Sequence, residues 1–160
     1  MKKYFLTLVF MSTLFGFELM ANNITINLDV MKKSPKLTML FFHMNHCGYC
    51  ERMEKKTIQN SDIQKLIKQN FTLIDLNVDE QNSVIFNNKT YTNKKFSVIQ
   101  DVDFFPTVLF LDENNEIIYK AQGHRTVEKF KLILQFIQDK EFEEMSFFEY
   151  YESKTTHDKE

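Results

Sequence analysis

The feature that most constrains this chain is a short apolar run leading into two closely spaced cysteines. Residues 37–42 are almost continuously apolar, and Cys47-Gly48-Tyr49-Cys50 follows within a few positions. A brief, near-continuous apolar run is typical of a strand buried on both faces. From Cys50 onward, apolar side chains recur at the spacing of one helical face. The pattern predicts a buried strand, a turn that carries the cysteines, and a helix that begins there.

The N-terminal segment, residues 1–21, differs from the rest of the chain. Lys2 and Lys3 precede an uncharged stretch, Tyr4–Phe17. This stretch is shorter than the roughly 20 residues of a membrane-spanning helix, but it suits the apolar region of a secretory signal peptide. We expect cleavage after Ala21 and export to the periplasm. An uncleaved N-terminal membrane anchor is the alternative.

Composition and charge exclude several classes of protein. With 160 residues, 43% of them hydrophobic, the chain is long enough for one globular domain with a sizeable core. A formal net charge of -2 argues against a nucleic-acid binder, which needs a basic face. Two cysteines are too few for a disulfide-stapled miniprotein or a closed four-cysteine zinc site.

The C-terminal segment, residues 139–160, is acidic. It carries eight acidic and three basic residues, a balance typical of a solvated surface or a helical extension. Its aromatic residues Phe147, Phe148, Tyr150 and Tyr151 recur at helical spacing. We therefore expect a last helix that docks on the domain, with a partner-binding face as the alternative.

Between these segments, predicted strands and helices alternate. Ser61–Gln64 has the pattern of a capping box that opens a helix. Residues 71–78 are predicted to form a second inner strand, which a right-handed crossover would make parallel to the first. Asn87-Asn88 separates two strand-like runs and tolerates the positive φ of a tight hairpin turn. The remaining predicted elements are a short helix over 93–98, a hairpin of strands 107–111 and 116–120, and a helix capped by Thr126.

Redox chemistry is predicted at Cys47 and Cys50. A thiol at the start of a helix faces unpaired backbone N–H groups and the helix dipole, which favour its thiolate. Cys47 is therefore the predicted nucleophile toward a disulfide, and Cys50, one turn deeper, the resolving thiol. The alternatives are a copper or zinc site completed by His43 or His46, and an inert structural disulfide. Glu51 follows the second cysteine, which excludes the usual haem-attachment motif.

Together with Phe105-Pro106-Thr107 ahead of the second hairpin, these features resemble the thioredoxin superfamily over about residues 35–138. The hairpin at 84–91 is similar to that of exported, single-domain thioredoxin-like proteins, including those associated with sulfur oxidation. The resemblance implies an α/β, thioredoxin-like fold: a central mixed β-sheet flanked by helices, with a hairpin insertion and a C-terminal helical extension. The predicted organisation is a signal peptide (1–21), a thioredoxin-like domain (22–138) and an acidic C-terminal extension (139–160).

The resemblance also implies roles for residues around the cysteines. In the family, a cis proline faces the redox pair and leaves neighbouring backbone free for a substrate strand, and Pro106 matches it. Its neighbours Phe105 and Thr107 would present that backbone. Gly48 and Tyr49, between the cysteines, are expected to support substrate binding, with Tyr49 exposed.

Two departures from the family pattern concern proton transfer and charge. Where many members carry a buried carboxylate, this chain has Phe41, so Cys50 lacks the usual proton acceptor. Asp75 is the alternative acceptor, unless it pairs with a lysine or points to water. His46 replaces the family's tryptophan; it either stabilises the Cys47 thiolate as a cation or is a solvated loop residue.

The predicted function is that of an exported thiol–disulfide oxidoreductase working as a reductase, with no cofactor besides the Cys47–Cys50 pair. Expected partners are protein disulfide or thiol substrates and a membrane or periplasmic electron donor, with no nucleic acid. A monomer is expected because no dimerisation domain is recognised, which also argues against an isomerase that clamps substrates between two subunits.

Overall fold

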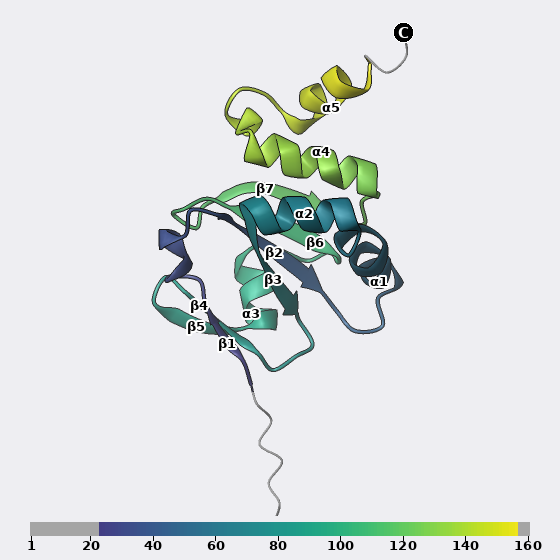
Figure 1. Ribbon diagram of the computed structural model, residues 1–160. Helices are drawn as coiled ribbons and strands as arrows, with labels where there is room; N and C mark the ends of the chain where they lie inside the picture. The colour runs from purple at the N-terminus through teal and green to yellow at the C-terminus, as the bar shows by residue number, and fades with distance from the viewer. Residues whose placement is uncertain (1–22, 157–160) are drawn as a thin grey trace, which may run out of the picture.

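The computed structural model describes residues 23–156, so the predicted signal peptide lies outside the described residues. Two sheets and their helices make up the fold (Figure 1). The elements are, in order, β1 (Thr25–Asn27), η1 (Met31–Lys33), β2 (Leu37–His43), α1 (Gly48–Arg52), η2 (Met53–Ile58), α2 (Ser61–Asn70), β3 (Phe71–Asn77), β4 (Ser83–Phe86), β5 (Lys89–Thr92), α3 (Asn93–Ile99), β6 (Thr107–Leu111), β7 (Ile117–Gln122), α4 (Val127–Gln138), η3 (Glu141–Glu143) and α5 (Phe147–Thr155).

The larger sheet has the strand order β3-β2-β6-β7, so β3 is an edge strand and the prediction of a second inner strand over 71–78 is wrong. β2 runs parallel to β3 and antiparallel to β6, and β7 is antiparallel to β6, so the predicted mixed sheet is confirmed. Residues 38–42 of β2 are buried, as expected for a strand covered on both faces. β7 extends to Gln122, two residues beyond the predicted return strand.

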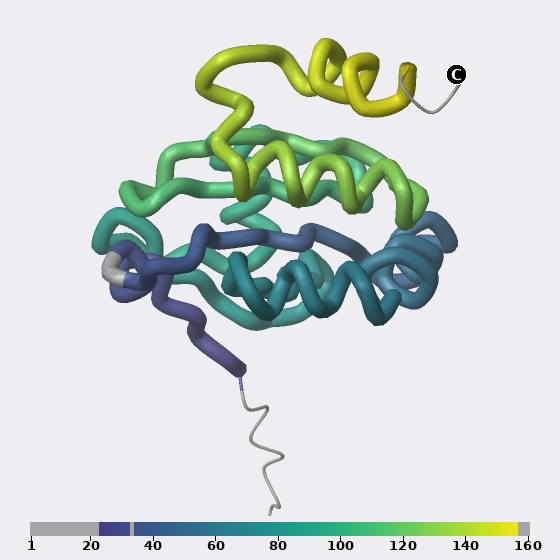
Figure 2. The backbone as a smooth tube through the Cα atoms, turned by 45° about the horizontal axis from the view of Figure 1, so that its top comes forward, coloured from purple at the N-terminus to yellow at the C-terminus, as the bar shows by residue number. Residues whose placement is uncertain are grey.

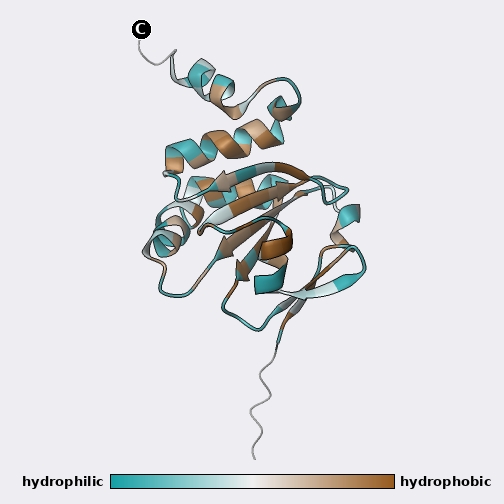
Figure 3. Ribbon diagram, turned by 180° about the vertical axis from the view of Figure 1, so that it is seen from behind, coloured by the Kyte–Doolittle hydropathy of each residue, from teal (hydrophilic) through white to brown (hydrophobic). Residues whose placement is uncertain are grey.

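Helices cover both faces of this sheet. On one face, Phe41 packs with Met53 of η2, Ile63 of α2 and Phe130 of α4 in one buried cluster. On the other face, Phe42 packs with Phe96 of α3 in a second cluster. Figure 3 shows the hydrophobic colour concentrated in the strands of the sheet between these layers. The predicted helices flanking a central sheet are therefore confirmed.

The predicted hairpin forms, but it joins a different sheet. Its tip residues Asn87 and Asn88 have φ values of 51° and 58°, the left-handed conformation that the turn requires. β4 also pairs in parallel with β1, which the sequence analysis did not predict. The Asp29 carboxylate accepts the backbone N–H groups of both tip residues at 2.8 Å. This contact fastens the insertion to the chain ahead of β2.

The predicted capping box at Ser61–Gln64 is wrong by one residue. Asn60 is the N-cap of α2, and its side-chain oxygen accepts the N–H groups of Asp62 and Ile63 at 3.0 and 3.4 Å. Asparagine caps a helix as well as serine does, so both neighbours satisfied the sequence pattern. Thr126 caps α4 as predicted, through the Lys129 N–H.

The C-terminal segment docks on α4, as predicted (Figure 2). Phe147 of α5 packs against Phe136 of α4 and Tyr119 of β7, with ring centroids 5.5 and 5.6 Å apart. Tyr150, one turn further along α5, is buried against Phe136. Phe148 points outward and is 72% exposed. One face of α5 therefore extends the core cluster.

This packing predicts different effects for the two adjacent phenylalanines of α5. Phe147→Ala removes a half-buried ring from the aromatic cluster and should lower the free energy of unfolding by about 1–3 kcal/mol. Phe148→Ala removes a ring that is exposed to solvent and should change the free energy of unfolding by less than about 0.5 kcal/mol. Urea unfolding of both variants checks this expectation. Equal midpoints for the two variants would show that α5 does not stabilise the domain.

Candidate functional site

Three turns meet at one end of the larger sheet because of its strand register. Phe42, near the end of β2, is in register with Thr107 at the start of β6, and Thr107 is in register with Gln122 at the end of β7. The segment after β2 carries the cysteines, the segment before β6 carries Pro106, and the segment after β7 begins with Gly123. Antiparallel pairing thus brings together turns that are far apart in the sequence.

Cys47 and Cys50 form a disulfide at the strand-to-helix junction, with an S–S distance of 2.05 Å. Cys47 is the N-cap of α1, and its sulfur accepts the Cys50 backbone N–H at 3.2 Å. Cys47 is partly exposed, whereas Cys50 is only 3% exposed. An N–H group directed at a sulfur stabilises negative charge there once the disulfide is reduced. The more accessible sulfur is therefore also the one better placed to be a thiolate.

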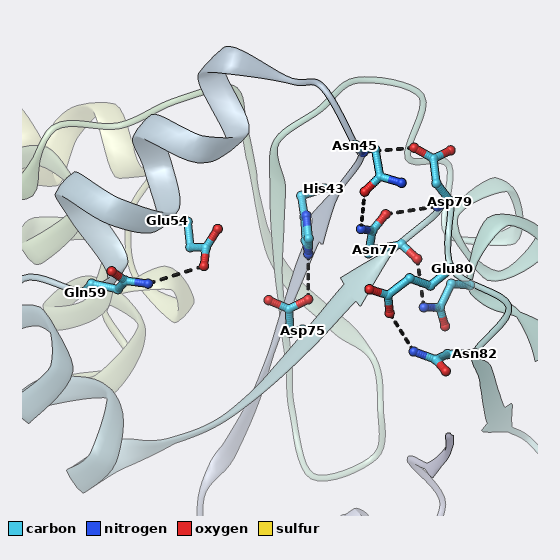
Figure 4. A network of polar contacts seen from close by, with 10 residues as sticks. His43, Asn45, Glu54, Gln59, Asp75, Asn77, Asp79, Glu80 and Asn82 are labelled. Atoms are coloured by element: carbon cyan, nitrogen blue, oxygen red, sulfur yellow. Dashed lines mark hydrogen bonds and ion pairs between the residues drawn. The ribbon is translucent and has the colours of Figure 1, made fainter. Parts of the chain in front are cut away.

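Two polar residues, one at the end of β3 and one just after it, hold the loop that precedes the cysteines. The Asn45 N–H donates to the Asp79 carboxylate at 2.9 Å, and the Asn77 side-chain amide donates to the Asn45 side-chain oxygen at 2.8 Å (Figure 4). His46, next in this loop, is exposed and has a φ of 55°. Neither anchor was predicted from the sequence, although two short polar side chains at the end of an apolar run were the available signal.

The segment before β6 is held from two sides. The Phe105–Pro106 peptide bond is cis. The Gly123 N–H donates to the Pro106 carbonyl at 2.7 Å, and the Thr107 hydroxyl donates to the Phe104 carbonyl at 2.6 Å. Thr107 is fully buried within the sheet, whereas Phe104 is 57% exposed. Thr107 therefore supports this turn from beneath, and Phe104 is the ring that faces solvent.

The helical segment η2, which directly follows α1 and its cysteine, contacts the turn after β7. The Thr57 hydroxyl donates to the Arg125 carbonyl at 2.6 Å, and the Arg125 N–H lies 3.4 Å from the Met53 sulfur. Gly123 approaches the Phe104 ring, because a Cβ added to this glycine would lie 3.6 Å from it. These contacts connect all three turns into one surface around the disulfide.

Tyr49, between the two cysteines, is 64% exposed. The guanidinium carbon of Arg52, one turn later, lies 5.7 Å from the centre of its ring, within the range of a cation–π contact. Gly48 has no heavy atom within 4 Å of the position that a Cβ would take. The surface between the cysteines is therefore open and carries one exposed aromatic ring.

Asp75 pairs with a histidine rather than with a lysine, and His43 is its partner. The Asp75 carboxylate lies 2.5 Å from the His43 Nε2, and the His43 ring stacks on Phe41 with centroids 5.0 Å apart. Asp75 lies opposite Phe41 in the β2–β3 register, with its side chain 61% exposed at the sheet edge. Asp75 therefore keeps contact with water and has a histidine, not a lysine, as its charged partner.

Charge around His43 outweighs its burial. Burial alone would lower the pKa of His43, but the hydrogen bond and charge of Asp75, with the charges of Glu54 and Glu80, raise it above the usual value. Figure 4 shows Glu54 of η2 and Asp75 of β3 on different sides of the imidazole. The arrangement can take up or release a proton near neutral pH.

Among residues 23–156, no three His, Cys, Asp or Glu side chains are placed to hold one ion together. In the same part of the chain, no helix combines the length and apolar character needed to cross a membrane.

Comparisons with known proteins place the fold. Residues 26–138 match the family of thioredoxin-like domains. A thioredoxin-fold protein from Helicobacter pylori is similar, with 23% identity and a TM-score of 0.68, covering 85% of this chain and 91% of that one. A thioredoxin from Thermus thermophilus has 18% identity and a TM-score of 0.55, covering 72% and 86%. A DsbH oxidoreductase has 19% identity and a TM-score of 0.50, covering 71% and 85%. A search of curated proteins gives no match.

The His43–Asp75 contact predicts how His43 titrates. Asp75→Asn removes the hydrogen-bonded charge, so the pKa of His43 should fall. Because the native pKa is raised, the pair stabilises the fold below about pH 6.5 and loses this contribution as the pH rises through the raised pKa. An NMR titration of the His43 ring protons measures the shift. Glu80→Gln, which removes a more weakly acting charge, should lower the pKa less; equal shifts in both variants would contradict the assignment.

Proposed function

The chain belongs to the family of thioredoxin-like domains and is a thiol–disulfide oxidoreductase; we propose that it is exported and reduces disulfides in proteins outside the cytoplasm. The observation that carries this proposal is the pairing of a partly exposed Cys47 at a helix start with a buried Cys50. That asymmetry gives the two sulfurs different tasks.

The proposed reaction has two exchange steps. The Cys47 thiolate attacks one sulfur of the substrate disulfide, a Cys47–substrate bond forms, and the other substrate sulfur leaves as a thiolate. The Cys50 thiol then loses its proton and attacks the Cys47 sulfur, which releases the second substrate thiolate. The substrate gains two electrons, and the chain is left with its Cys47–Cys50 disulfide. An external dithiol donor restores the reduced form by the reverse exchange.

A free stretch of backbone supports the docking of a protein substrate. Within residues 23–156, neither the N–H nor the carbonyl of Phe105 makes a hydrogen bond. In contrast, the Pro106 carbonyl is occupied by Gly123. In the proposal, an extended substrate segment pairs with the Phe105 backbone while its cysteine reaches Cys47. The exposed rings of Tyr49 and Phe104 would cover the apolar side chains of that segment.

The proton of Cys50 is assigned to the His43–Asp75 pair. Cys50 of α1 and Glu54 of η2 are four residues apart in two helical segments that follow each other directly. The charge of Glu54 helps to raise the pKa of His43, and Figure 4 shows Glu54 and His43 in the same polar network. In the proposal, His43 receives the proton when Cys50 attacks, and Asp75 orients and stabilises the resulting cation.

The proposal of export rests on residues 1–21. Their two lysines and uncharged apolar stretch match a secretory signal, and the periplasm would supply both disulfide substrates and a membrane or periplasmic electron donor. N-terminal sequencing of the chain recovered from the periplasm checks the cleavage after Ala21. A chain found only in the cytoplasm would refute this part of the proposal.

The division of work between the cysteines predicts distinct variants. Cys47→Ser should abolish insulin-disulfide reduction, whereas Cys50→Ser should still form a mixed disulfide with substrate and fail to release it. In the reduced wild-type chain, brief iodoacetamide treatment at neutral pH should label Cys47 first, as mass mapping would show. Preferential labelling of Cys50 would reverse the assigned roles. Stoichiometric bound copper or zinc without insulin reduction would replace the reductase proposal with metal handling.

The proposed proton acceptor predicts a selective defect. Asp75→Asn and His43→Gln should each slow the resolving step by roughly a hundredfold, the low end of general base catalysis, and leave the first attack nearly unchanged. Single-turnover kinetics with a disulfide substrate separates the two steps. Glu80→Gln serves as the control, because it removes a nearby charge without touching the pair. Unaltered rates of both steps in both variants would leave His43–Asp75 with a structural role alone.

A further inference from the structure

Positive side chains gather beside the exposed side of the disulfide. Tyr49 directly precedes Cys50 in the sequence, and the guanidinium of Arg52 lies over the Tyr49 ring. An open cavity of about 290 Å³ on the same flank of the helix is lined by Gly48, Glu51, Arg52, Lys55 and Lys56. This hollow begins between the two cysteines and carries three cations and one acid.

A second arginine reaches the same region from the turn after β7. The Arg125 guanidinium lies 3.2 Å from the His124 carbonyl and 3.4 Å from the Gly123 carbonyl, so it stays close to the turn that contacts Phe104. Burial, followed by the charges of Arg52 and Arg125, lowers the pKa of His124. Both arginines therefore act on one imidazole, although they come from separate elements.

These cations are not balanced by ion pairs within the described chain. Glu51 pairs with Lys55 at 3.5 Å, and both side chains are exposed. Between residues 23 and 156, Arg52, Lys56 and Arg125 have no carboxylate within 4.0 Å. Asp103, exposed beside Phe104, is the acid of the opposite turn. We call Arg52, Lys56, His124 and Arg125 the basic rim, on a chain whose formal net charge is -2.

We propose that the basic rim selects protein disulfides in which acidic residues flank the attacked cysteine. This inference rests on the proposed reductase function and adds the chemical class of its substrates. Arginine binds carboxylates through two parallel hydrogen bonds, and uncompensated cations around a site raise the local concentration of an anionic segment. The exposed rings of Tyr49 and Phe104 then contact the apolar neighbours of the same segment.

A competing explanation is that the cations only lower the pKa of the Cys47 thiol. In that case the rim would accelerate attack on every disulfide by the same factor, whatever the charge of the substrate. Selection by charge instead predicts a rate that depends on the sign of the flanking residues and falls with salt. A series of substrates that differ only in charge separates these two effects.

The test uses the reduced full chain with Cys50→Ser, which stops after the first exchange. Three peptides share one sequence and one cysteine, flanked by two Glu, two Gln or two Lys, and each carries the same coloured aromatic thiol in disulfide linkage. Attack by Cys47 forms the Cys47–peptide bond and releases the aromatic thiolate, whose colour gives the rate. At low salt the Glu peptide should react about tenfold faster than the Gln peptide, and the Lys peptide more slowly. At about 1 M salt the three rates should converge.

Charge-neutral variants assign the effect to the rim. Arg52→Gln and Arg125→Gln should each reduce the ratio of Glu to Gln peptide rates severalfold at low salt. Lys68→Gln removes the same charge from α2 at the far end of β2, where Lys36 donates to the Lys68 carbonyl, and should leave the ratio unchanged. Circular dichroism of each variant confirms that it is folded. Glutathione in disulfide linkage to the same coloured aromatic thiol, a small anionic disulfide with the same leaving group, shows whether charge alone suffices or a peptide segment is needed.

His124 provides a readout that does not depend on rate. When the Glu peptide is linked to Cys47, its carboxylates should raise the pKa of His124 relative to the Gln-peptide adduct, as an NMR titration would show. Equal rates for the three peptides at low salt, or Arg52 and Arg125 variants that slow all three equally, would overturn the proposal. If the glutathione disulfide reacted as fast as the Glu peptide, selection of a protein segment would also be overturned. Failure of every disulfide to react would instead refute the reductase function itself.

Discussion

The antiparallel pairing of β2, β6 and β7 is the constraint on which the site depends. Phe42 lies opposite Thr107, and Thr107 lies opposite Gln122. This register brings the turn after β2, the turn before β6 and the turn after β7 to the same end of the sheet. Burial of β2 on both faces holds that register, because a slip by one residue would exchange the side chains of its two faces. The redox pair, the Pro106 turn and the Gly123 turn are therefore positioned by backbone pairing.

The His43–Asp75 pair lies at the edge of the sheet and not in its core. Phe41 occupies the position where related proteins often bury a carboxylate, and a hydrophobic ring there needs no partner to be buried. The ionisable groups lie instead at the end of β2 and on β3, where His43 stacks on Phe41 and Asp75 keeps contact with water. A half-exposed pair avoids the desolvation penalty of a buried charge, and it remains able to exchange protons near neutral pH.

The charges of the domain are also divided between its surfaces. The segment from residue 139 onward contributes acidic residues, while its apolar side chains Phe147 and Tyr150 pack on α4. The redox end carries the uncompensated cations of the basic rim. The formal net charge of -2 therefore does not describe the basic rim, which is the local charge that an acidic substrate segment would meet in the proposal.

Local patterns in the sequence determined three features: the strand ahead of the cysteines, the hairpin turn at Asn87-Asn88 and the docking face of the last helix. Each follows from hydrophobic periodicity or turn chemistry, which are properties of neighbouring residues. Local patterns misplaced the α2 cap by one residue, since Asn60 and Ser61 both suit that position. The tertiary structure alone decided that Asp75 pairs with His43, 32 positions away, and that Asp79 anchors the loop before the cysteines, 34 positions away. Such contacts depend on how strands pair and where their edges meet, and the spacing of residues along one chain carries no record of that pairing.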